Sequence, residues 1–415
     1  MVDTIIVGRY LGEEALAAVG STGCLMFLVL GFANGIAQGF GVMVSHAFGA
    51  KDFKLLRHYV ALSLILTLII SLLLTIPTVT ASRLLLAWMH TPENIIAMAD
   101  AYIKVIFAGI LLTMAYNVLS GILRGIGDSR TPLYFLILSS VLNIILDVVL
   151  IVYTGLGTAG AAYATIIAQG VSAVLCFFYM YRKYDILRTR HEDYYLDSAG
   201  VKNMLAIGVP MALNYSITAI GTMIMQSAVN VFGSSVVAAF TAASKVSNIA
   251  TQSMPTLGTA MATYCGQNLG AGKYDRIYAG MRQGLFLCFG AAATAAAICI
   301  FGGRFIVSWF VSNPSEEIFS SAMQYLTIAS WFFLPLAMIF LYRNALQGLD
   351  QGLIPMLSGV VELACRFGVI ALIPASTGFF GVCFADPAAW AGAGIPLFIT
   401  YLLWEHRMKQ CSMAV

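Results

Sequence analysis

The sequence predicts an all-α polytopic membrane protein made of two duplicated halves, and three observations carry this prediction. Of the 415 residues, 60% are hydrophobic and only 10% are charged, whereas soluble domains have roughly 25% charged residues. The apolar stretches are about 20 residues long or more, which is the length that crosses a bilayer as a helix. A segment in lipid must satisfy its own backbone polar groups, so these stretches are expected to be helical.

The third observation is an internal repeat at an offset of roughly 221 positions. Gly12 has its counterpart at Gly233, and Gly49-Ala50 at Gly270-Ala271. Near Leu123-Arg124-Gly125 the best offset is about 223, as small gaps in loops would produce. Many transporters consist of two equivalent membrane halves with a cavity between them, so the repeat favours transport.

The apolar stretches define about eleven full spans, each long enough for one bilayer crossing. They lie near 18–46, 55–80, 95–124, 131–154, 158–182, 203–231, 237–267, 276–302, 318–348, 352–374 and 379–405. Residues 1–10 resemble the tail of a further helix. The repeat maps span 203–231 to positions that begin before Met1, so the first helix is expected to be truncated by roughly twenty residues.

The domain organisation follows from the longest polar stretch, Tyr181 to Gly200, whose charged residues indicate a solvated linker. We expect an N-terminal transmembrane lobe at 1–182, a cytoplasmic linker at 183–202 and a C-terminal transmembrane lobe at 203–415.

The distribution of Lys and Arg predicts the orientation, because short cytoplasmic loops carry an excess of these residues. The set assigned to cytoplasmic loops and to the C-terminal tail is Lys51, Lys54, Arg57, Arg124, Arg130, Arg182, Lys183, Arg188, Arg190, Lys202, Lys273, Arg276, Arg282, Arg343, Arg407 and Lys409. We therefore expect a multi-pass protein of the plasma membrane with its C-terminus inside. Charges at the ends of spans do not make a nucleic-acid patch, so we expect no nucleic-acid partner.

Few ionisable residues lie deep within spans, and an isolated charge there costs about 2.5–3.5 kcal/mol or more, so each is a candidate site residue. The candidates are Asp3, Asp147, Glu362 and Arg366, with Lys245 and Asp386 nearer the ends of spans. For any one of them, the alternative is a structural hydrogen bond between helices.

Asn143 and Asp147 are four residues apart and share one helix face. A carboxylate beside an amide oxygen suits Na⁺, and a desolvated Asp147 can instead carry a proton. Thr165 can add a hydroxyl group and Asp3 a second carboxylate. These four residues form the predicted cation-coupling site.

Glu362 and Arg366 are also four residues apart and occupy the corresponding places in the second half at an offset of about 219. Because this pair can neutralise itself, we interpret it first as structural or gating and only second as ion-binding. The cation site is therefore expected in the first half.

An apolar substrate cavity is a further candidate feature. Met223, Met254, Tyr215 and Tyr264 can line it, although methionine and aromatic residues also serve as plain core. The GxGxxG match at Gly155 to Gly160 follows an apolar run too long for a strand, so it is rejected as a nucleotide motif. No HExxH, P-loop, GxSxG or His cluster is present. We expect no enzyme activity, no metal and no cofactor, with Na⁺ or H⁺ as the coupling ion.

Several segments, taken together in order and spacing, resemble the multidrug and toxic compound extrusion (MATE) family. They include Val2-Asp3-Thr4, Gly49-Ala50, Leu123-Arg124-Gly125, Asn143-Ile-Ile-Leu-Asp147, Gln267-Asn268-Leu269-Gly270-Ala271-Gly272 and Glu362-Leu-Ala-Cys-Arg366. The resemblance implies twelve helices in two six-helix lobes, and efflux of amphipathic or cationic small molecules driven by inward Na⁺ or H⁺.

The resemblance also implies a first-lobe cation site, which carries over onto Asp3, Asn143, Asp147 and Thr165. Some members have an acidic residue in the seventh helix, where this chain offers Gln226, a further candidate for the cavity. A second-lobe site of the acidic type is therefore not expected. We expect the lipid bilayer as surroundings and a monomeric protein.

Three functions compete, and the leading one is a secondary antiporter that works by alternating access. The second is a lipid-linked precursor flippase of a related superfamily branch, which would favour a cationic cavity to which only Arg366 and Lys245 can contribute. A membrane enzyme or receptor is third. An enzyme should show a nucleophile with its base or a metal cluster, and a receptor need not show a duplication.

Overall fold

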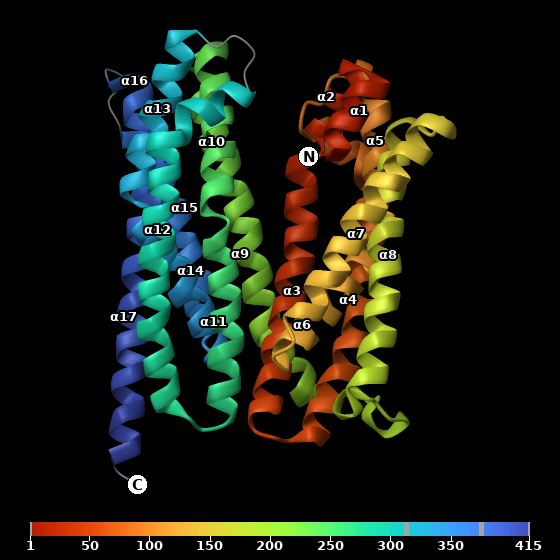
Figure 1. The fold of residues 1–415 in the computed structure, drawn as a ribbon, viewed down its shortest axis with the longest axis vertical. Coiled ribbons are helices and arrows are strands. Elements are labelled where there is room, and N and C mark those ends of the chain that lie inside the picture. Colours follow the sequence, from red (N-terminus) through yellow and green to blue (C-terminus); the bar gives the residue numbers. More distant parts are fainter. Residues whose placement is uncertain (1, 311–314, 373–376, 414–415) are drawn as a thin grey trace. The chain divides into compact units, whose positions relative to one another are not determined.

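The computed structural model describes residues 2–310, 315–372 and 377–413. These described residues form helices joined by short turns and contain no strand. Eight helices are long and apolar enough to cross a membrane, or up to ten if each of two bent pairs is one span. The predicted all-α polytopic fold is confirmed, as Figure 1 shows for the course of the chain.

The helices of the first part of the chain follow the predicted spans closely. They are α1 (Val2–Leu11), α2 (Glu13–Ser21), α3 (Gly23–Gly49), α4 (Phe53–Trp88), α5 (Glu93–Ala108), α6 (Ile110–Gly125), α7 (Arg130–Val148), the π-helix η1 (Val149–Tyr153) and α8 (Gly157–Lys183). The 3₁₀ turns η2 (Asp185–Leu187) and η3 (His191–Asp193) then lead into α9 (Ser198–Asn230).

The second part of the chain is also helical in its described residues. Its helices are α10 (Ser234–Thr251), α11 (Ser253–Gly270), α12 (Tyr274–Phe310), α13 (Glu316–Trp331), α14 (Phe333–Gly348), α15 (Leu353–Leu372), α16 (Gly378–Val382) and α17 (Ala385–Met413).

Two predicted spans are broken helices rather than straight ones. Span 95–124 is α5 followed by α6 with a bend of 46°, and span 318–348 is α13 followed by α14 with a bend of 52°. The first break falls at Gly109, where a Cβ atom would collide with the Ile166 side chain. Span 237–267 is likewise interrupted, at Gln252 between α10 and α11. These interruptions explain why the structure counts eight to ten candidate spans where the sequence predicts about eleven.

Two pairs of glycines at the offset of the predicted repeat have similar and unusual backbone conformations. Gly12 precedes α2 with φ 88°, and Gly233 precedes α10 with φ 89°. Gly157 at the start of α8 has φ 57°, and Gly378 at the start of α16 has φ 58°. An L-residue rarely adopts such positive φ values. The same glycine-dependent turns therefore open corresponding helices in both halves.

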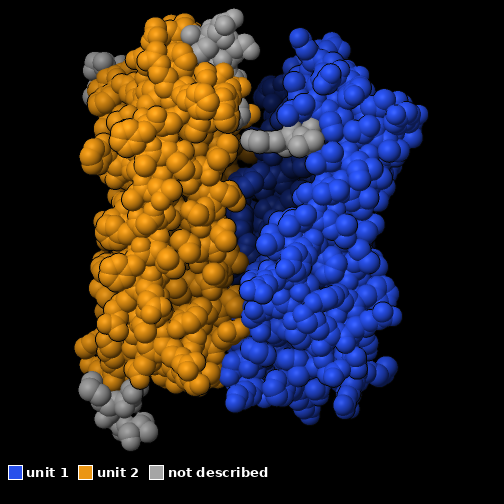
Figure 2. Space-filling model, viewed as in Figure 1, with its two compact units in different colours: residues 1–216 blue, residues 217–415 orange. Residues whose placement is uncertain are grey.

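The chain divides into two compact units, residues 1–216 and 217–415, coloured separately in Figure 2. This division lies within α9, whereas the predicted linker residues 183–202 contain η2, η3 and the start of α9. The predicted domain bounds stay a prediction. The division lies within α9 because of a close approach in unit 1. A Cβ atom on Gly35 of α3 would collide with the Ala212 backbone of α9, and one on Gly39 with the Gly208 backbone. The first part of α9 therefore packs with the helices of unit 1.

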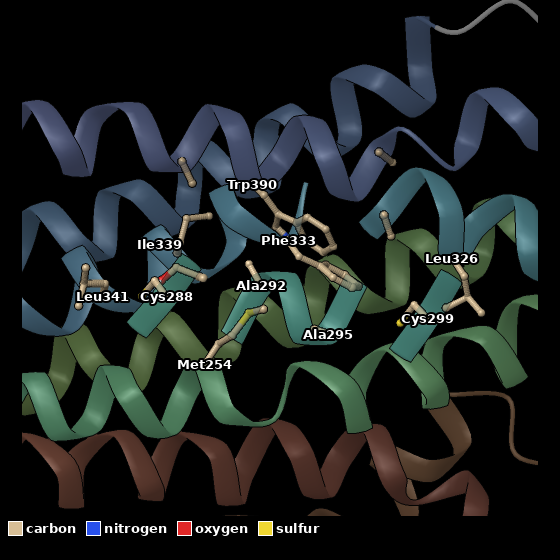
Figure 3. Close-up of a cluster of buried hydrophobic side chains, with 14 of the residues drawn as sticks. Met254, Cys288, Ala292, Ala295, Cys299, Leu326, Phe333, Ile339, Leu341 and Trp390 are labelled. Atoms are coloured by element: carbon tan, nitrogen blue, oxygen red, sulfur yellow. The ribbon is translucent and has the colours of Figure 1, made fainter. Parts of the chain in front are cut away.

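Each unit has its own buried apolar core. In unit 2 it centres on large side chains such as Phe333 and Trp390, together with Met254, and Figure 3 shows part of it. In unit 1 one cluster joins α1 and α2 to α5, with Phe107 and Ile110 fully buried. These cores hold the helix positions on which the polar residues below depend.

One residue counted among the cytoplasmic loop charges was assigned wrongly. Arg343 lies inside α14 and is only 9% exposed. It is buried because Glu362 accepts a hydrogen bond from it, a pairing that the apolar pattern alone does not reveal. The orientation itself stays a prediction.

Candidate functional site

The structure brings three helices of unit 1 together around the predicted cation-coupling residues. Asn143 and Asp147 lie one turn apart on α7, as their spacing predicts. Thr165 comes from α8 and Asp3 from α1, and both α1 and α8 pack against α7. Four residues that are distant in the sequence therefore meet in one cluster, which we call the α1–α7–α8 cluster.

Asn143 connects the two neighbouring helices through its side-chain amide. In the orientation that satisfies both amide atoms, Nδ2 donates to Asp3 Oδ1 at 2.9 Å and Oδ1 accepts from the Thr165 backbone N–H at 3.3 Å. The Thr165 hydroxyl donates to the Ala161 carbonyl at 3.1 Å and keeps lone pairs for a further partner. Asn143 thus fixes one carboxylate and one hydroxyl group relative to each other.

Asp147 is the buried carboxyl group of this cluster. It is fully buried, and neither of its carboxylate oxygens has a hydrogen-bond partner among the described residues. Asp3 lies near enough for the two carboxylates to interact electrostatically. Burial of a carboxylate without a partner costs free energy. Binding of a cation or a proton by Asp147 would therefore stabilise the folded protein.

Two features next to Asp147 escaped the sequence analysis. The α-helix α7 changes at Val149 into the π-helix η1, a rare form that often occurs at functional sites. Tyr102 of α5 is buried within electrostatic reach of both Asp3 and Asp147. Neither feature has a local sequence signal, because the π-turn depends on packing and Tyr102 belongs to a different span.

The cluster offers a hard, oxygen-rich environment. Two carboxylates, one amide oxygen and one hydroxyl group are the ligand types that alkali and alkaline-earth cations prefer. Two neighbouring carboxylates repel each other when both are ionised, and either a bound cation or a bound proton relieves that repulsion. The arrangement therefore suits reversible binding of a small cation.

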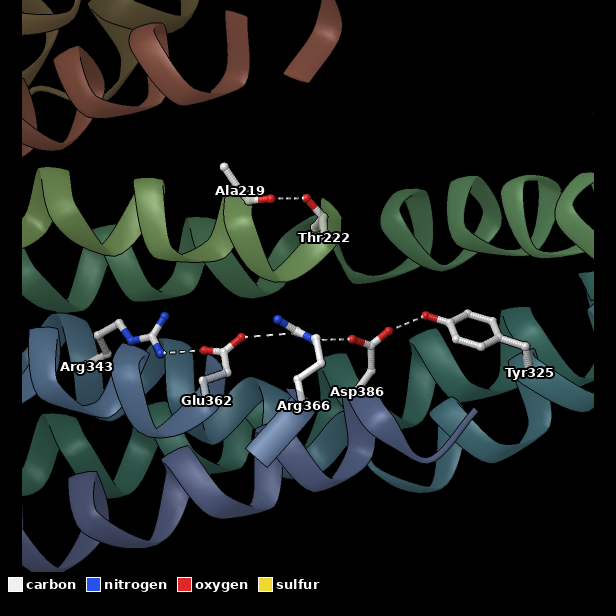
Figure 4. Close-up of polar contacts among 7 residues, drawn as sticks. All are labelled: Ala219, Thr222, Tyr325, Arg343, Glu362, Arg366 and Asp386. Atoms are coloured by element: carbon white, nitrogen blue, oxygen red, sulfur yellow. Dashed lines mark hydrogen bonds and ion pairs between the residues drawn. The ribbon is translucent and has the colours of Figure 1, made fainter. Parts of the chain in front are cut away.

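Unit 2 has a different polar arrangement, a chain of four ionic side chains that ends on a tyrosine (Figure 4). Glu362 accepts from Arg343 at 2.9 Å and contacts Arg366 at 3.4 Å. Arg366 Nε donates to Asp386 at 2.9 Å, and the Tyr325 hydroxyl also donates to Asp386 at 2.9 Å. We call this the α13–α14–α15–α17 network.

This network balances its own charge, with two arginines against two carboxylates. The predicted contact between Glu362 and Arg366 is present, but each residue also has a second and closer partner, Arg343 and Asp386 respectively. Gly221 of α9 makes room for the arrangement, since a Cβ atom there would collide with the Arg366 guanidinium. Asp386 is a candidate from the sequence, but its partners Tyr325 and Arg366 come from other helices and have no signal in its own segment.

The residues predicted to line a substrate cavity have varied surroundings, and their role stays a prediction. Met254 belongs to the unit 2 core and is 1% exposed, whereas Met223 is half-buried. Gln226 donates to Asn230 on the same helix at 2.9 Å. The Tyr264 hydroxyl donates to the Arg276 carbonyl, and the Tyr215 hydroxyl accepts from Gln38 at 2.6 Å.

Within the described residues, no group of three or more His, Cys, Asp or Glu side chains is placed to hold a metal ion. The seven cysteines that the structure describes carry free thiols, and five of them are buried.

Comparison with known proteins shows which family the chain resembles. The MatE family model matches residues 1–149 and 210–372. The probable multidrug resistance protein YoeA of Bacillus subtilis (strain 168) is 30% identical over 341 residues, which cover 80% of this chain and 73% of that protein. The probable multidrug resistance protein YpnP of the same organism is 28% identical and covers 92% and 85% of the two chains.

Solved structures show the same fold. A crystal structure of a MATE protein in complex with MaL6 has a TM-score of 0.90 at 23% identity and covers 99% of this chain and 94% of its own. An outward-facing multidrug resistance MATE family transporter has the same score and identity, with coverage of 99% and 92%. The family match covers most of the chain and both units. The chain therefore belongs to the MatE family of multi-pass membrane transporters.

Proposed function

We propose that the protein is a secondary antiporter that exports amphipathic or cationic small molecules in exchange for Na⁺ or H⁺ by alternating access. The observation that carries the proposal is Asp147, a fully buried carboxylate without a hydrogen-bond partner among the described residues. Relatives named as multidrug resistance proteins support the cargo class.

In this proposal the coupling ion binds between α1 and α7. When the site is empty, Asp3 and Asp147 repel each other, and when it is loaded the ion or proton draws the two carboxylates together. Asn143 holds Asp3 and Thr165 in place, so the change is passed to α1 and α8. A ligand changes a conformational equilibrium only through such differential contacts.

The flippase alternative is less well supported. A pyrophosphate headgroup requires uncompensated positive charge, and Arg366 is already paired with Glu362 and Asp386. The α1–α7–α8 cluster of unit 1 contributes carboxylates, which repel such a headgroup.

The test is transport by purified protein in proteoliposomes, with ethidium as the exported cation and the Na⁺ and pH gradients imposed separately. The wild-type protein should respond to one of the two gradients, which identifies the coupling ion. Asp147→Asn should lose gradient-driven transport, because an amide neither exchanges a proton nor balances a cation. It should keep its melting temperature, because the amide replaces a carboxylate that has no partner among the described residues.

Asp52→Asn is the matched control. Asp52 caps α4 by accepting from the Leu55 N–H, and asparagine caps helices equally well. This variant should transport at the wild-type rate. Gradient-driven transport by Asp147→Asn at matched membrane abundance would contradict the assignment of the coupling site.

A further inference from the structure

Two adjoining cavities lie at the ends of α7 and α8 that carry Arg130 and Lys183. The first has a volume of about 470 Å³ and is lined by polar groups, including Arg130, Lys183 and Tyr134. The second has about 480 Å³ and is mainly apolar, with Leu175 and Phe178 in its wall. Tyr179 and Lys183 line both cavities, so the two lie side by side. The proposed coupling residues line neither cavity, so the pair is separate from the α1–α7–α8 cluster.

Positive charge prevails around these cavities. Arg130 lines the first and Arg182 the second, and neither has an ion-pair partner in the part of the chain that the structure describes. Lys183 donates to the Tyr179 hydroxyl at 2.5 Å, and its ammonium group lies 4.9 Å from the Tyr179 ring centroid and 5.4 Å from that of Tyr184. Aromatic rings hold the cation in place without neutralising it.

The one carboxylate that lines the first cavity, Asp128, is occupied by its own neighbours. It accepts from the Thr131 N–H at 3.0 Å, from the Thr131 hydroxyl at 2.6 Å and from the Tyr184 hydroxyl at 2.7 Å. Burial favours a higher pKa of Asp128, but these hydrogen bonds and the nearby Lys183 outweigh it and lower the pKa. Asp128 therefore braces the cavity wall, and three basic side chains remain against one carboxylate.

The apolar cavity faces the membrane. Phe178 is 57% exposed and Leu175 is 41% exposed, and both belong to the membrane-spanning helix α8. The neighbouring span of α7 and η1 has only 17% of its most apolar window buried within the protein. Large apolar side chains exposed on a spanning helix contact lipid hydrocarbon. A basic cavity thus opens directly beside a lipid-facing groove.

We propose that this pair of cavities binds an anionic phospholipid, with its phosphate at Arg130 and Lys183 and an acyl chain along Phe178 and Leu175. The charge of the first cavity suits a phosphate group, and the apolar surface of the second suits a hydrocarbon chain joined to it. Basic pockets between transmembrane helices take anionic lipid headgroups in this way. The lipid belongs to the leaflet at the Arg130 end of the helices, which the distribution of Lys and Arg predicts to be cytoplasmic.

The experiment measures lipid retention by the full chain. Protein in nanodiscs of equal parts phosphatidylglycerol and phosphatidylcholine is transferred to detergent, and bound lipids are counted by native mass spectrometry. The wild-type protein should retain phosphatidylglycerol in preference to phosphatidylcholine. Arg130→Gln and Lys183→Gln should each lower this preference about fivefold, the size expected for one basic residue near an anionic lipid surface.

The matched control is Lys54→Gln at the exposed start of α4, which belongs to neither cavity. It should leave the preference unchanged. Phe178→Ala should reduce retention of both lipids, because it removes the wall of the acyl groove. All four positions are exposed, so the variants should fold, and size-exclusion chromatography checks this.

Three outcomes would overturn the proposal. The first is equal retention of the two lipids by the wild-type protein, and the second is a loss in Lys54→Gln as large as in Lys183→Gln. The third is a rise in melting temperature with glycerol 3-phosphate as large as with phosphatidylglycerol, which would indicate a soluble anion as the ligand.

Discussion

Two buried carboxyl groups, Asp147 in unit 1 and Glu362 in unit 2, differ in their polar contacts. Asp147 has no hydrogen-bond partner among the described residues, whereas Glu362 contacts two arginines. A paired buried carboxylate resists any change of charge, because losing it leaves the arginines uncompensated. A buried carboxylate without such a partner is stabilised when it binds a cation or a proton. At the scale of single residues, Asp147 can therefore change its charge state at a lower cost in free energy than Glu362 can.

Asp128 gives a prediction about pH. Its pKa in the folded protein is lowered: burial acts in the opposite direction, but hydrogen bonds from Thr131 and Tyr184 outweigh it. Its contribution to stability is therefore complete above the unfolded pKa of about 3.9 and is lost as the pH falls through the folded pKa. We expect Asp128→Asn to melt at a lower temperature than the wild type at pH 6, and this difference to shrink below pH about 4.

The measurement is the melting temperature of each variant in detergent at a series of pH values from 6 to about 3. Asp185→Asn is the control, because Asp185 is 82% exposed at its side chain and pairs only with the exposed Arg188. It should follow the wild type throughout. A difference for Asp128→Asn that stays constant down to the lowest pH would show that the carboxylate charge contributes nothing.

At the scale of elements, small residues set how closely helices approach. Gly35 and Gly39 on α3 face the backbone of α9 so directly that a Cβ atom has no room. Such stripes of small residues are the usual means of close helix packing in membranes. The breaks in the predicted spans are a second feature at the scale of helices. The pairs α5 with α6 and α13 with α14 each bend by more than 40°.

We predict that Gly39→Ala weakens unit 1. The added methyl group would meet the Gly208 backbone, and overpacking of this kind costs about 1–3 kcal/mol. Gly20→Ala is the control, because its Cβ atom meets nothing within 4 Å, and alanine favours a helix by up to about 1 kcal/mol. The melting temperature should fall for the first variant and stay level or rise for the second. Equal values would show that α3 and α9 can separate freely at this point.

At the scale of the whole molecule, the predicted repeat is reflected in a few glycine turns, whereas the buried polar residues of the two units differ. Gly12 and Gly233 precede α2 and α10, and Gly157 and Gly378 begin α8 and α16, with similar positive φ values within each pair. Yet unit 1 contains the α1–α7–α8 cluster and unit 2 the charge-balanced α13–α14–α15–α17 network. The buried polar residues of the two units therefore differ in kind.

The unit 2 network should act as a structural unit. Glu362→Gln leaves Arg343 without its carboxylate, and breaking such a buried pair costs about 3–5 kcal/mol. In double-mutant cycles, Glu362 should couple to both arginines, and more strongly to Arg343 at 2.9 Å than to Arg366 at 3.4 Å, which Asp386 also holds.

Unfolding by SDS titration gives the free energies for these cycles. The exposed pair Arg304 and Glu316 is the control, and its coupling should be at most about 1 kcal/mol. If the changes in unfolding free energy of the single variants add up in the double variants, Glu362 is not coupled to the arginines and the network is not a structural unit.

The sequence by itself determined the all-α membrane fold, because long apolar runs are a local physical signal. The repeat and the roles of the candidate residues of unit 1 stay predictions. Long apolar runs must become helices in lipid, and the spacing of Asn143 and Asp147 fixes a shared helix face. The meeting of Asp3, Asn143 and Thr165 was also anticipated, and the contacts among them are present.

Only the tertiary structure decided the partners of the buried charges. Arg343 and Glu362 form an ion pair between two different helices. Asp386 likewise contacts Arg366 and Tyr325, each of which lies on another helix. The sequence around each residue does not indicate these partners. The bends, the π-turn after Asp147 and the boundary of the units inside α9 likewise depend on contacts between distant segments. Hydrophobicity and helical period are properties of neighbouring residues in the sequence, so the sequence predicts the helices. Ion pairs and close packing join residues of different helices, so the sequence does not predict these contacts.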